Sequence, residues 1–285
     1  MKLIAATLVA AFAGAVPLTT DVGEWSFGLA ASGGSVWVGG LGGNDVLRID
    51  PSTGKVVLRV PVGPRVFNLA AAPNAVWAVS NVGGSVSRID ARTGRVTQTV
   101  RVGLAPYDVA WGFGSAWVSN SGDGTVSRVT GNRVVKSFRV GVEPNGVTAY
   151  DGSLWVADHT AGKLLRIDPA TNRVTGAVAL AGADWIVGLG ASLYVSQETN
   201  VVSRVDLHTL KVSGHANVDG NPLGAAVVDG KLWVPCIDAG TIDVVDPLTM
   251  RVTSRRPGGP GPIVVLPAFG HTWVSHSTGN AVWRL

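Results

Sequence analysis

The histidine and glutamate side chains of this chain show none of the spacings that known catalytic motifs require. Its five histidines lack the H-x-x-x-H and H-E-x-x-H patterns of zinc sites. No G-x-S-x-G elbow is present, and pairs such as Gly83-Gly84 lie between predicted strands instead of opening a phosphate-binding helix. The single cysteine, Cys236, is expected to pack as a small apolar side chain. We therefore assign no catalytic residue and no metal ligand from motifs.

Side chains suited to ligand binding recur where predicted strands begin and end. At one such position the chain varies from aromatic to polar, with Phe27, Phe67, Tyr107, Asn145, Asp184, Leu223 and Ile263. We predict ligand contacts from the following residues: Trp25, Phe67, Asn68, Tyr107, Asp108, Glu143, Asn145, Asp158, His159, Trp185, Glu198 and His276. Aromatic rings, carboxamides and scattered carboxylates suit a peptide, a protein or a polar small molecule with apolar faces. The alternative is a solvated rim that binds nothing specific.

The elements that must position these side chains follow from an aromatic residue that recurs every 38 to 40 residues. The seven markers are Trp37, Trp77, Trp117, Trp155, Tyr194, Trp233 and Trp273. Each copy contains four short apolar segments separated by turns, such as Asp50-Pro51-Ser52-Thr53-Gly54. Units of about 40 residues with four antiparallel strands, A to D, form the blades of a β-propeller. The sequence therefore predicts an all-β, seven-bladed propeller.

The repeat also explains most of the tryptophans and the basic charge. An apolar residue lies eight positions before every marker, so both positions are expected in the core between blades. Six arginines follow the markers by 10 or 11 residues: Arg48, Arg88, Arg128, Arg166, Arg204 and Arg284. A net charge of +4 could suggest nucleic acid as a partner, but residues distributed around a ring form no basic patch. The distribution of the arginines therefore argues against nucleic acid.

The two ends of the chain predict how the ring closes. Residues 1–15 resemble a signal peptide, with a basic start, an apolar run and an A-x-A step, which predicts a secreted, periplasmic or extracellular protein. The apolar run is too short to span a bilayer. The alternative to a signal peptide is that Leu3–Ala15 is an outer strand of the fold. The last copy stops after its strand C, and residues 16–23 align with a strand D. We therefore predict one propeller domain over residues 16–285, a monomer whose N-terminal strand completes blade 7.

In a propeller the D–A and B–C loops emerge on one face, and the A–B and C–D turns on the other. Loops on a rigid scaffold commonly carry binding residues. The C–D turns repeat from copy to copy, whereas the D–A and B–C loops vary. The predicted contact residues belong to this varied D–A/B–C face.

The motifs Ala116-Trp117-Val118-Ser119-Asn120 and Thr125-Val126-Ser127-Arg128-Val129 resemble the YVTN-type propeller repeat. The chain is also similar to virginiamycin B lyases, seven-bladed propellers that open a cyclic depsipeptide with a divalent metal, typically Mg²⁺. That family uses a proline-histidine step and a glutamate-x-histidine step, which align here with Pro106-Tyr107 and Glu143-Pro144-Asn145. Glu143 fits, but Tyr107 and Asn145 replace the two histidines. Neither replacement serves as an acid or base near neutral pH.

Three functions are consistent with these features. The first is a secreted binding module that acts through the D–A/B–C face without catalysis and without a cofactor. The second is a lyase or lactone hydrolase, for which the resemblance implies Mg²⁺ or Ca²⁺ near Glu143, Asp108 and Asn145. The third is DNA binding, which the distributed arginines disfavour.

Overall fold

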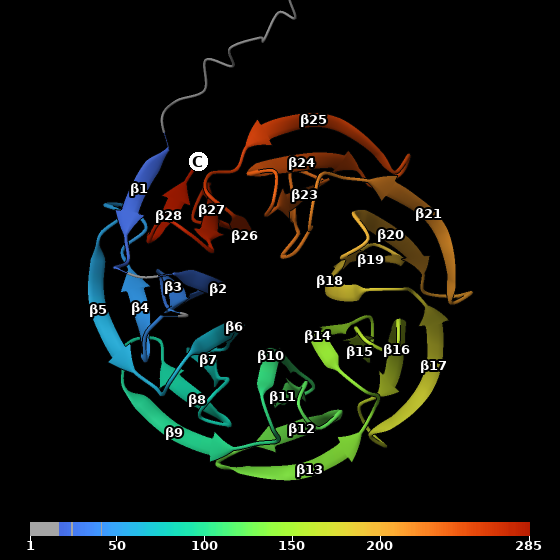
Figure 1. The fold of residues 1–285 in the computed structure, drawn as a ribbon. Helices are drawn as coiled ribbons and strands as arrows, with labels where there is room; N and C mark the ends of the chain where they lie inside the picture. The colour runs from blue at the N-terminus through green and yellow to red at the C-terminus, as the bar shows by residue number, and fades with distance from the viewer. Residues whose placement is uncertain (1–16, 24, 41) are drawn as a thin grey trace, which may run out of the picture.

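The computed structural model describes residues 17–23, 25–40 and 42–285, which form 28 strands and no helix. The strands make seven four-stranded antiparallel sheets arranged as blades around a central axis (Figure 1). The predicted signal peptide, residues 1–15, lies outside the described residues. The predicted seven-bladed β-propeller is confirmed. Among the described residues no segment forms a helix that could cross a membrane.

The first four blades follow the chain in order, with strand A innermost. Blade 1 comprises β2 (Ser26–Ser32), β3 (Ser35–Gly40), β4 (Asp45–Ile49) and β5 (Val56–Pro61). Blade 2 comprises β6 (Val66–Ala72), β7 (Ala75–Ser80), β8 (Ser85–Asp90) and β9 (Val96–Arg101). Blade 3 comprises β10 (Pro106–Gly112), β11 (Ser115–Asn120), β12 (Thr125–Thr130) and β13 (Arg133–Arg139). Blade 4 comprises β14 (Pro144–Tyr150), β15 (Ser153–Asp158), β16 (Lys163–Asp168) and β17 (Arg173–Ala179).

The remaining blades close the ring. Blade 5 comprises β18 (Ala183–Leu189), β19 (Ser192–Gln197), β20 (Val201–Asp206) and β21 (Lys211–Asn217). Blade 6 comprises β22 (Ala226–Val228), β23 (Lys231–Cys236), β24 (Thr241–Asp246) and β25 (Arg251–Pro257). Blade 7 comprises β26 (Pro262–Ala268), β27 (His271–His276), β28 (Ala281–Arg284) and, outermost, β1 (Leu18–Asp21).

The N-terminal strand β1 pairs antiparallel with β28, from Leu18 opposite Arg284 to Asp21 opposite Ala281. The hydroxyl of Thr20 also donates to the carbonyl of Gly54 in blade 1, at 2.6 Å. Strands from the two ends of the chain therefore share one blade, which gives the ring a closed, hydrogen-bonded seam.

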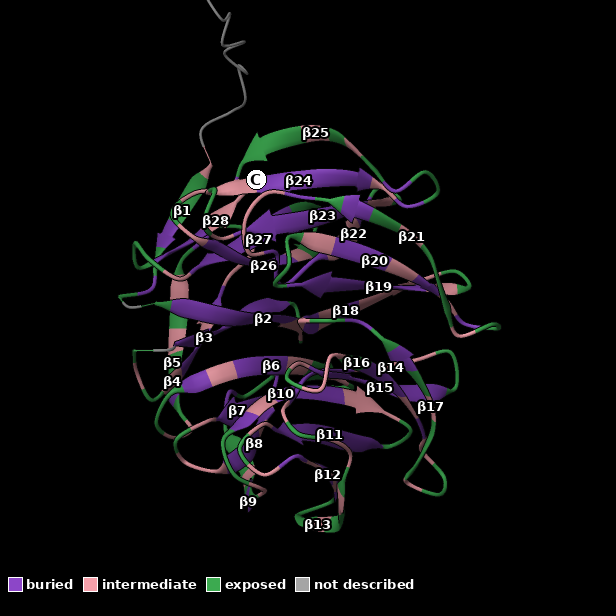
Figure 2. Cartoon of the chain, turned by 45° about the vertical axis from the view of Figure 1, so that its right-hand side comes forward, coloured by how far each residue is buried: buried purple, intermediate pink, exposed green. Residues whose placement is uncertain are grey.

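The aromatic markers lie in the core, as predicted. Trp37, Trp117 and Trp273 are 0% exposed, and the apolar residues eight positions earlier are buried in every blade. The indole nitrogen of Trp117 donates to the carbonyl of Gly112 in the A–B turn, at 3.0 Å, so the buried polar atom is satisfied. Figure 2 shows the same gradient, with buried inner strands and an exposed outer strand β25.

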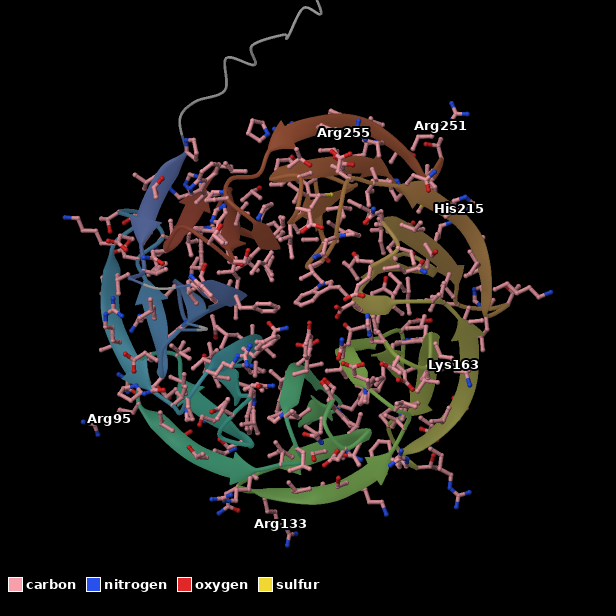
Figure 3. All side chains as sticks on the ribbon, viewed as in Figure 1. Arg95, Arg133, Lys163, His215, Arg251 and Arg255 are labelled. Atoms are coloured by element: carbon pink, nitrogen blue, oxygen red, sulfur yellow. The ribbon has the colours of Figure 1, made fainter. Side chains whose placement is uncertain are left out.

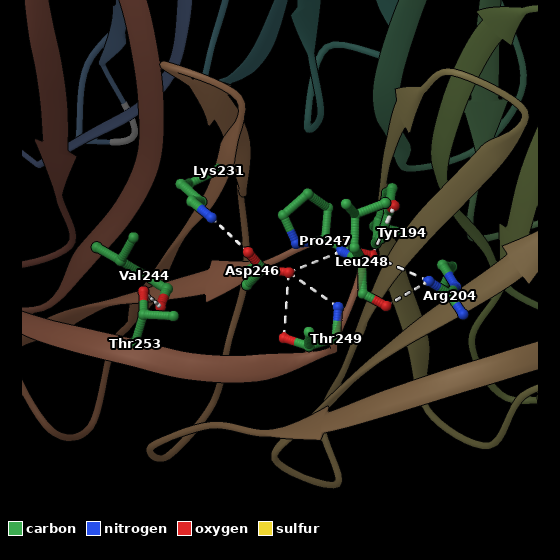
Figure 4. Close-up of polar contacts among 9 residues, drawn as sticks. All are labelled: Tyr194, Arg204, Lys231, Val244, Asp246, Pro247, Leu248, Thr249 and Thr253. Atoms are coloured by element: carbon green, nitrogen blue, oxygen red, sulfur yellow. Dashed lines mark hydrogen bonds and ion pairs between the residues drawn. The ribbon is translucent and has the colours of Figure 1, made fainter.

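Four of the six repeated arginines, Arg48, Arg128, Arg204 and Arg284, donate hydrogen bonds to a neighbouring blade. Arg128 stacks over Trp117, with its guanidinium carbon 4.7 Å from the ring centre, and donates to the carbonyl of Pro169 in blade 4 at 2.8 Å. Figure 4 shows the copy in blade 5, where Arg204 donates to the carbonyls of Pro247 and Leu248 in blade 6. This C–D turn is held by its own aspartate, Asp246. These four arginines are therefore structural, and other basic residues such as Arg95, Arg133 and Arg251 lie around the outer edge (Figure 3).

Candidate functional site

Six innermost strands and the segment before β22 bring seven residues together around the channel axis on the D–A/B–C face. We call this set, which comprises Phe27, Phe67, Tyr107, Asn145, Asp184, Leu223 and Ile263, the channel ring. Five of the seven are apolar or aromatic. Phe27 and Phe67 lie 4.3 Å apart between ring centres, and Phe67 and Tyr107 lie 4.6 Å apart. Phe27, Leu223 and Ile263 belong to one buried cluster, against which Phe67 and Trp185 pack.

A local irregularity of strand A places these side chains. Pairing between strands A and B shifts at this position in six blades, for example between Pro106 and Asp108 in blade 3 and between Ala183 and Trp185 in blade 5. In blade 6 strand A starts only at Ala226. An extra residue in one strand of a pair changes the direction of its side chain. Tyr107 and Asp184 stand at such shifts, so they leave the flat face of the blade.

Asp108 joins three neighbouring strands A below the ring. Its carboxylate accepts hydrogen bonds from Asn68 Nδ2 at 2.6 Å, from the backbone N–H of Val109 at 2.7 Å and from the N–H of Val147 at 2.9 Å. Burial raises the pKa of Asp108 to about 7, although these hydrogen bonds act in the opposite direction. Asn68 and Asp108 were predicted to contact a ligand, but the structure gives both side chains a bridging role between β6, β10 and β14.

Asp184 is the buried carboxylate of the channel ring itself, contributed by blade 5. It is 4% exposed, and its Oδ1 accepts no hydrogen bond from any donor among the described residues. Burial raises its pKa to about 6, and the carboxylates of Glu198 and Glu143 act in the same direction, whereas the charge of His159 and the side chain of Asn145 lower it. A buried polar atom without a partner is rare in folded proteins and calls for a physical explanation.

His159 lies between two glutamates from different loops. Its Nε2 is 3.0 Å from Glu198 Oε2, and its Nδ1 is 3.5 Å from Glu143 Oε2. Partial burial lowers the pKa of His159, but the contact with Glu198 and the charges of Asp184 and Glu143 outweigh this effect and raise it. We call Glu143, His159, Asp184 and Glu198 the His159 cluster.

The loops of blades 4 and 5 position this cluster. Glu143 immediately precedes β14, His159 follows β15, and Glu198 follows β19. The backbone N–H of His159 donates to the carbonyl of Glu143 at 2.9 Å, which ties the two loops of blade 4 together. Thr160 Oγ1 donates to the Glu143 carboxylate and orients it. Two hydrogen-bonded loops of blade 4 and one loop of blade 5 therefore carry Glu143, His159 and Glu198, and strand β18 carries Asp184.

Asp158 and His276, which were predicted to contact a ligand, are buried and bonded to backbone groups of their own blades. Both residues end a strand B and are 2% and 0% exposed. The Asp158 carboxylate accepts the backbone N–H groups of Val142 and Glu143 at 3.0 and 2.9 Å. The two ring nitrogens of His276 lie 2.8 Å from the carbonyl of Gly258 and 3.0 Å from that of Ala281. Both side chains therefore hold the loops of their own blades.

The same position serves this purpose in other blades. The side chain at the end of strand B bonds the backbone of its own D–A loop in Ser80, Asn120 and Gln197 as well. Its chemical type changes from blade to blade because each loop presents a different carbonyl or N–H group. The variation of residue type at this position therefore has a structural explanation in the differing D–A loops.

The other predicted contact residues occupy three kinds of place. Trp25 is 56% exposed at the rim of blade 1. Phe67 and Tyr107 belong to the aromatic part of the channel ring, which we call the aromatic arc. Asn145 is buried beside Asp184 in the polar part of the ring. Trp185 lines a cavity of about 210 Å³ within the channel, together with Asp108 and apolar residues of the strands A. Asp184 was not among the predicted contacts, although it occupies the same repeat position as Tyr107 and Asn145.

The donors of this region do not make a ready metal site. In the part of the chain that the structure describes, no group of three or more His, Cys, Asp or Glu side chains is arranged to hold a metal ion. The oxygens of Asp108 already accept three N–H groups, and Asn145 Oδ1 accepts the hydroxyl of Ser121 at 3.2 Å. The cluster instead combines carboxylates and an imidazole with aromatic rings, which suits ion pairing, hydrogen bonding and proton transfer.

Fold and repeat define the chain as a β-propeller repeat protein. A family described as "Repeat of unknown function (DUF6923)" matches residues 5–142. No curated protein matches the chain. Among solved structures it is similar to Kuenenia stuttgartiensis hydrazine synthase, with 18% identity, a TM-score of 0.80 and coverage of 91% of this chain and 95% of that one. It is also similar to the β-propeller domain of Myceliophteria thermophila Cps50 (Swd1), with 12% identity, a TM-score of 0.76 and coverage of 92% and 96%. At these identities the likeness is one of fold.

Proposed function

We propose that this propeller is a binding module whose ligand or protein partner docks on the D–A/B–C face, over the His159 cluster and the aromatic arc of the channel ring. The observation that carries the proposal is the meeting of Asp184, His159 and Tyr107 at one end of the channel. Buried ionisable groups with shifted pKa values beside aromatic side chains are typical of functional sites and rare in a merely structural core.

The experiment that tests this proposal is a fragment and peptide screen on the full chain, read from the indole N–H resonances of tryptophan. Trp25 and Trp185 lie on or below the proposed face, whereas Trp37, Trp117 and Trp273 are enclosed between blades. Ligands are expected to shift the Trp25 or Trp185 resonances and to leave the enclosed tryptophans unchanged. A Trp25→Phe variant assigns the rim signal. Ligands that act only on the opposite face, near Phe269, would contradict the proposal.

The second candidate is acid–base catalysis on an ester or lactone, as the lyase resemblance implies. A specific observation favours it: His159 lies 3.5 Å from Glu143, so the B–C loop of blade 4 supplies the imidazole that the aligned motifs lack. His159 has a raised pKa and the neighbouring Asp184 titrates at about 6, so both can exchange protons near neutral pH.

Turnover assays on a cyclic depsipeptide and on simple lactones test this candidate, with and without Mg²⁺ or Ca²⁺. Activity that is lost in His159→Asn and kept in His208→Asn would establish it. His208 is the matched control because it lies in the C–D turn of blade 5, away from the cluster. No turnover, together with no heat of Mg²⁺, Ca²⁺ or Mn²⁺ binding in calorimetry, would remove it.

We further propose that the protein is exported as a monomer and that cleavage follows Ala15. Support comes from the signal-like composition of residues 1–15 and from the place of β1, which begins three residues after this boundary. Mass analysis of the exported protein is expected to give a chain starting at Val16. For nucleic acid we expect weak binding with a shallow salt dependence, since repeat arginines such as Arg128 and Arg204 are engaged between blades.

A further inference from the structure

We propose that the ligand of this face carries a protonated amine or a guanidinium next to an apolar group. The cation binds among the carboxylates of Asp184, Glu143 and Glu198, and the apolar part lies against Tyr107 and Phe67. This inference rests on the proposed binding function and adds to it the chemical class of the ligand.

The first argument is the unpartnered oxygen of Asp184. Its Oδ1 is buried and receives no hydrogen bond from the described residues. In the second buried carboxylate of the channel, Asp108, each of the two oxygens accepts at least one hydrogen bond. A carboxylate oxygen removed from water is costly unless an N–H or O–H group replaces the water. A ligand ammonium or guanidinium supplies such donors together with a compensating charge.

The second argument is the charge balance of the cluster. Three carboxylates, Glu143, Asp184 and Glu198, surround the single imidazole of His159. Even when His159 is protonated, the ionised cluster keeps an excess of negative charge. The imidazole contacts Glu198 as an ion pair and not as a straight hydrogen bond, and the side chains of Glu143 and Glu198 are 41% and 56% exposed. The glutamates can therefore turn toward a cation that enters from solvent, whereas an anion would be repelled.

The third argument is the aromatic wall beside the carboxylates. Tyr107 stands in the channel ring between Phe67 and the polar positions Asn145 and Asp184. Burial raises its pKa, and the charges of the nearby carboxylates Asp184, Asp108, Glu198 and Glu143 act in the same direction. Tyr107 continues into Phe67 and Phe27 through ring contacts of 4.6 and 4.3 Å. The Arg65 guanidinium lies 6.0 Å from the centre of the Phe67 ring, so this wall already accepts one organic cation from the chain itself. An amine with an apolar body fits both halves of the site.

The test is calorimetric titration of the full chain with benzylamine and with benzyl alcohol, which has the same shape and no charge. Benzylamine is expected to bind at least about tenfold more tightly, the ratio that one charge-assisted hydrogen bond gives. Asp184→Asn and Glu198→Gln are each expected to weaken benzylamine about three- to tenfold and to leave benzyl alcohol unchanged. The matched control is Asp151→Asn, the same chemical change at an exposed A–B turn of blade 4, and it is expected to have no effect.

The outcomes separate this inference from the function on which it rests. Equal affinity for the two probes, with both shifting Trp25 or Trp185, would overturn the cation site and leave the binding face intact. If benzylamine did not bind while anionic or neutral ligands bound the same face, the cation site would likewise be overturned and the binding face left intact. If no probe, fragment or peptide of any class bound this face, the binding function itself would fall. Should Asp184→Asn not fold, the exposed Glu198→Gln carries the test alone.

Discussion

The buried carboxyl of Asp184 is expected to lower the stability of the folded chain as pH rises, and replacing Asp184 by asparagine is expected to remove this loss. Burial raises the pKa of this carboxyl from 3.8 to about 6. The folded chain therefore holds its proton more tightly than the unfolded chain, so stability from this group is complete below pH 3.8 and is lost as pH rises toward 6. A shift of this size corresponds to about 3 kcal/mol, of which about 2 kcal/mol falls between pH 4 and pH 7.5.

The assay is urea unfolding of the wild type and of Asp184→Asn at these two pH values. Asparagine has the shape of the protonated acid and does not titrate, so the difference in unfolding free energy between the two proteins should change by about 2 kcal/mol from pH 4 to pH 7.5. The ionisable groups around Asp184, namely Glu143, His159, Glu198, Tyr107 and Asp108, are the same in both proteins, so the difference between the two proteins isolates the substituted carboxyl. Asp151→Asn controls for an exposed carboxylate. A wild-type minus variant difference that is the same at both pH values would refute the reasoning.

Three further predictions concern the scaffold. Arg128→Ala removes the stacking on Trp117 and the bonds to blade 4. It should cost about 2 kcal/mol and about 3–4 °C in Tm, against about 0.5 kcal/mol for Arg133→Ala at the outer edge. Equal losses by calorimetry would show that the inter-blade contacts contribute nothing. Asp158→Ala frees the backbone around Glu143 and should speed amide exchange of Val142 and Glu143, with unchanged exchange contradicting the bracing role. Burial raises the pKa of Cys236 to about 12, so a thiol reagent at pH 8 should label it only in urea, and rapid labelling of the folded chain would disprove its burial.

The fold could be predicted because the repeat states the same physical requirement seven times. A buried indole on strand B, an apolar residue eight positions earlier and an aspartate-led turn leave one architecture that satisfies them all. The role of the arginines followed from the same logic, since a position repeated around a ring belongs to the scaffold. The contacts of Arg128 with Trp117 and Pro169 confirm it.

The site could be predicted only in part, because it depends on how unequal loops fold back on each other. Asp158 and His276 vary between copies as binding residues do, yet they turn inward to hold backbone groups whose positions the sequence does not reveal. The approach of His159 to Glu143 and Glu198 joins three loops of two blades, and no spacing in the sequence indicates it. The sequence shows that Asp184 occupies the same repeat position as Tyr107. Only its burial and its unpartnered oxygen, which the structure shows, identify it as a candidate binding residue.

The most direct test of a cation-binding face is a crystal structure of the full chain with benzylamine. The predicted result is an ammonium nitrogen within hydrogen-bonding distance of a carboxylate oxygen of Asp184 or Glu198, with the phenyl ring against Tyr107. Benzylamine bound only elsewhere, or lying at this face with its nitrogen turned away from every carboxylate, would contradict the account.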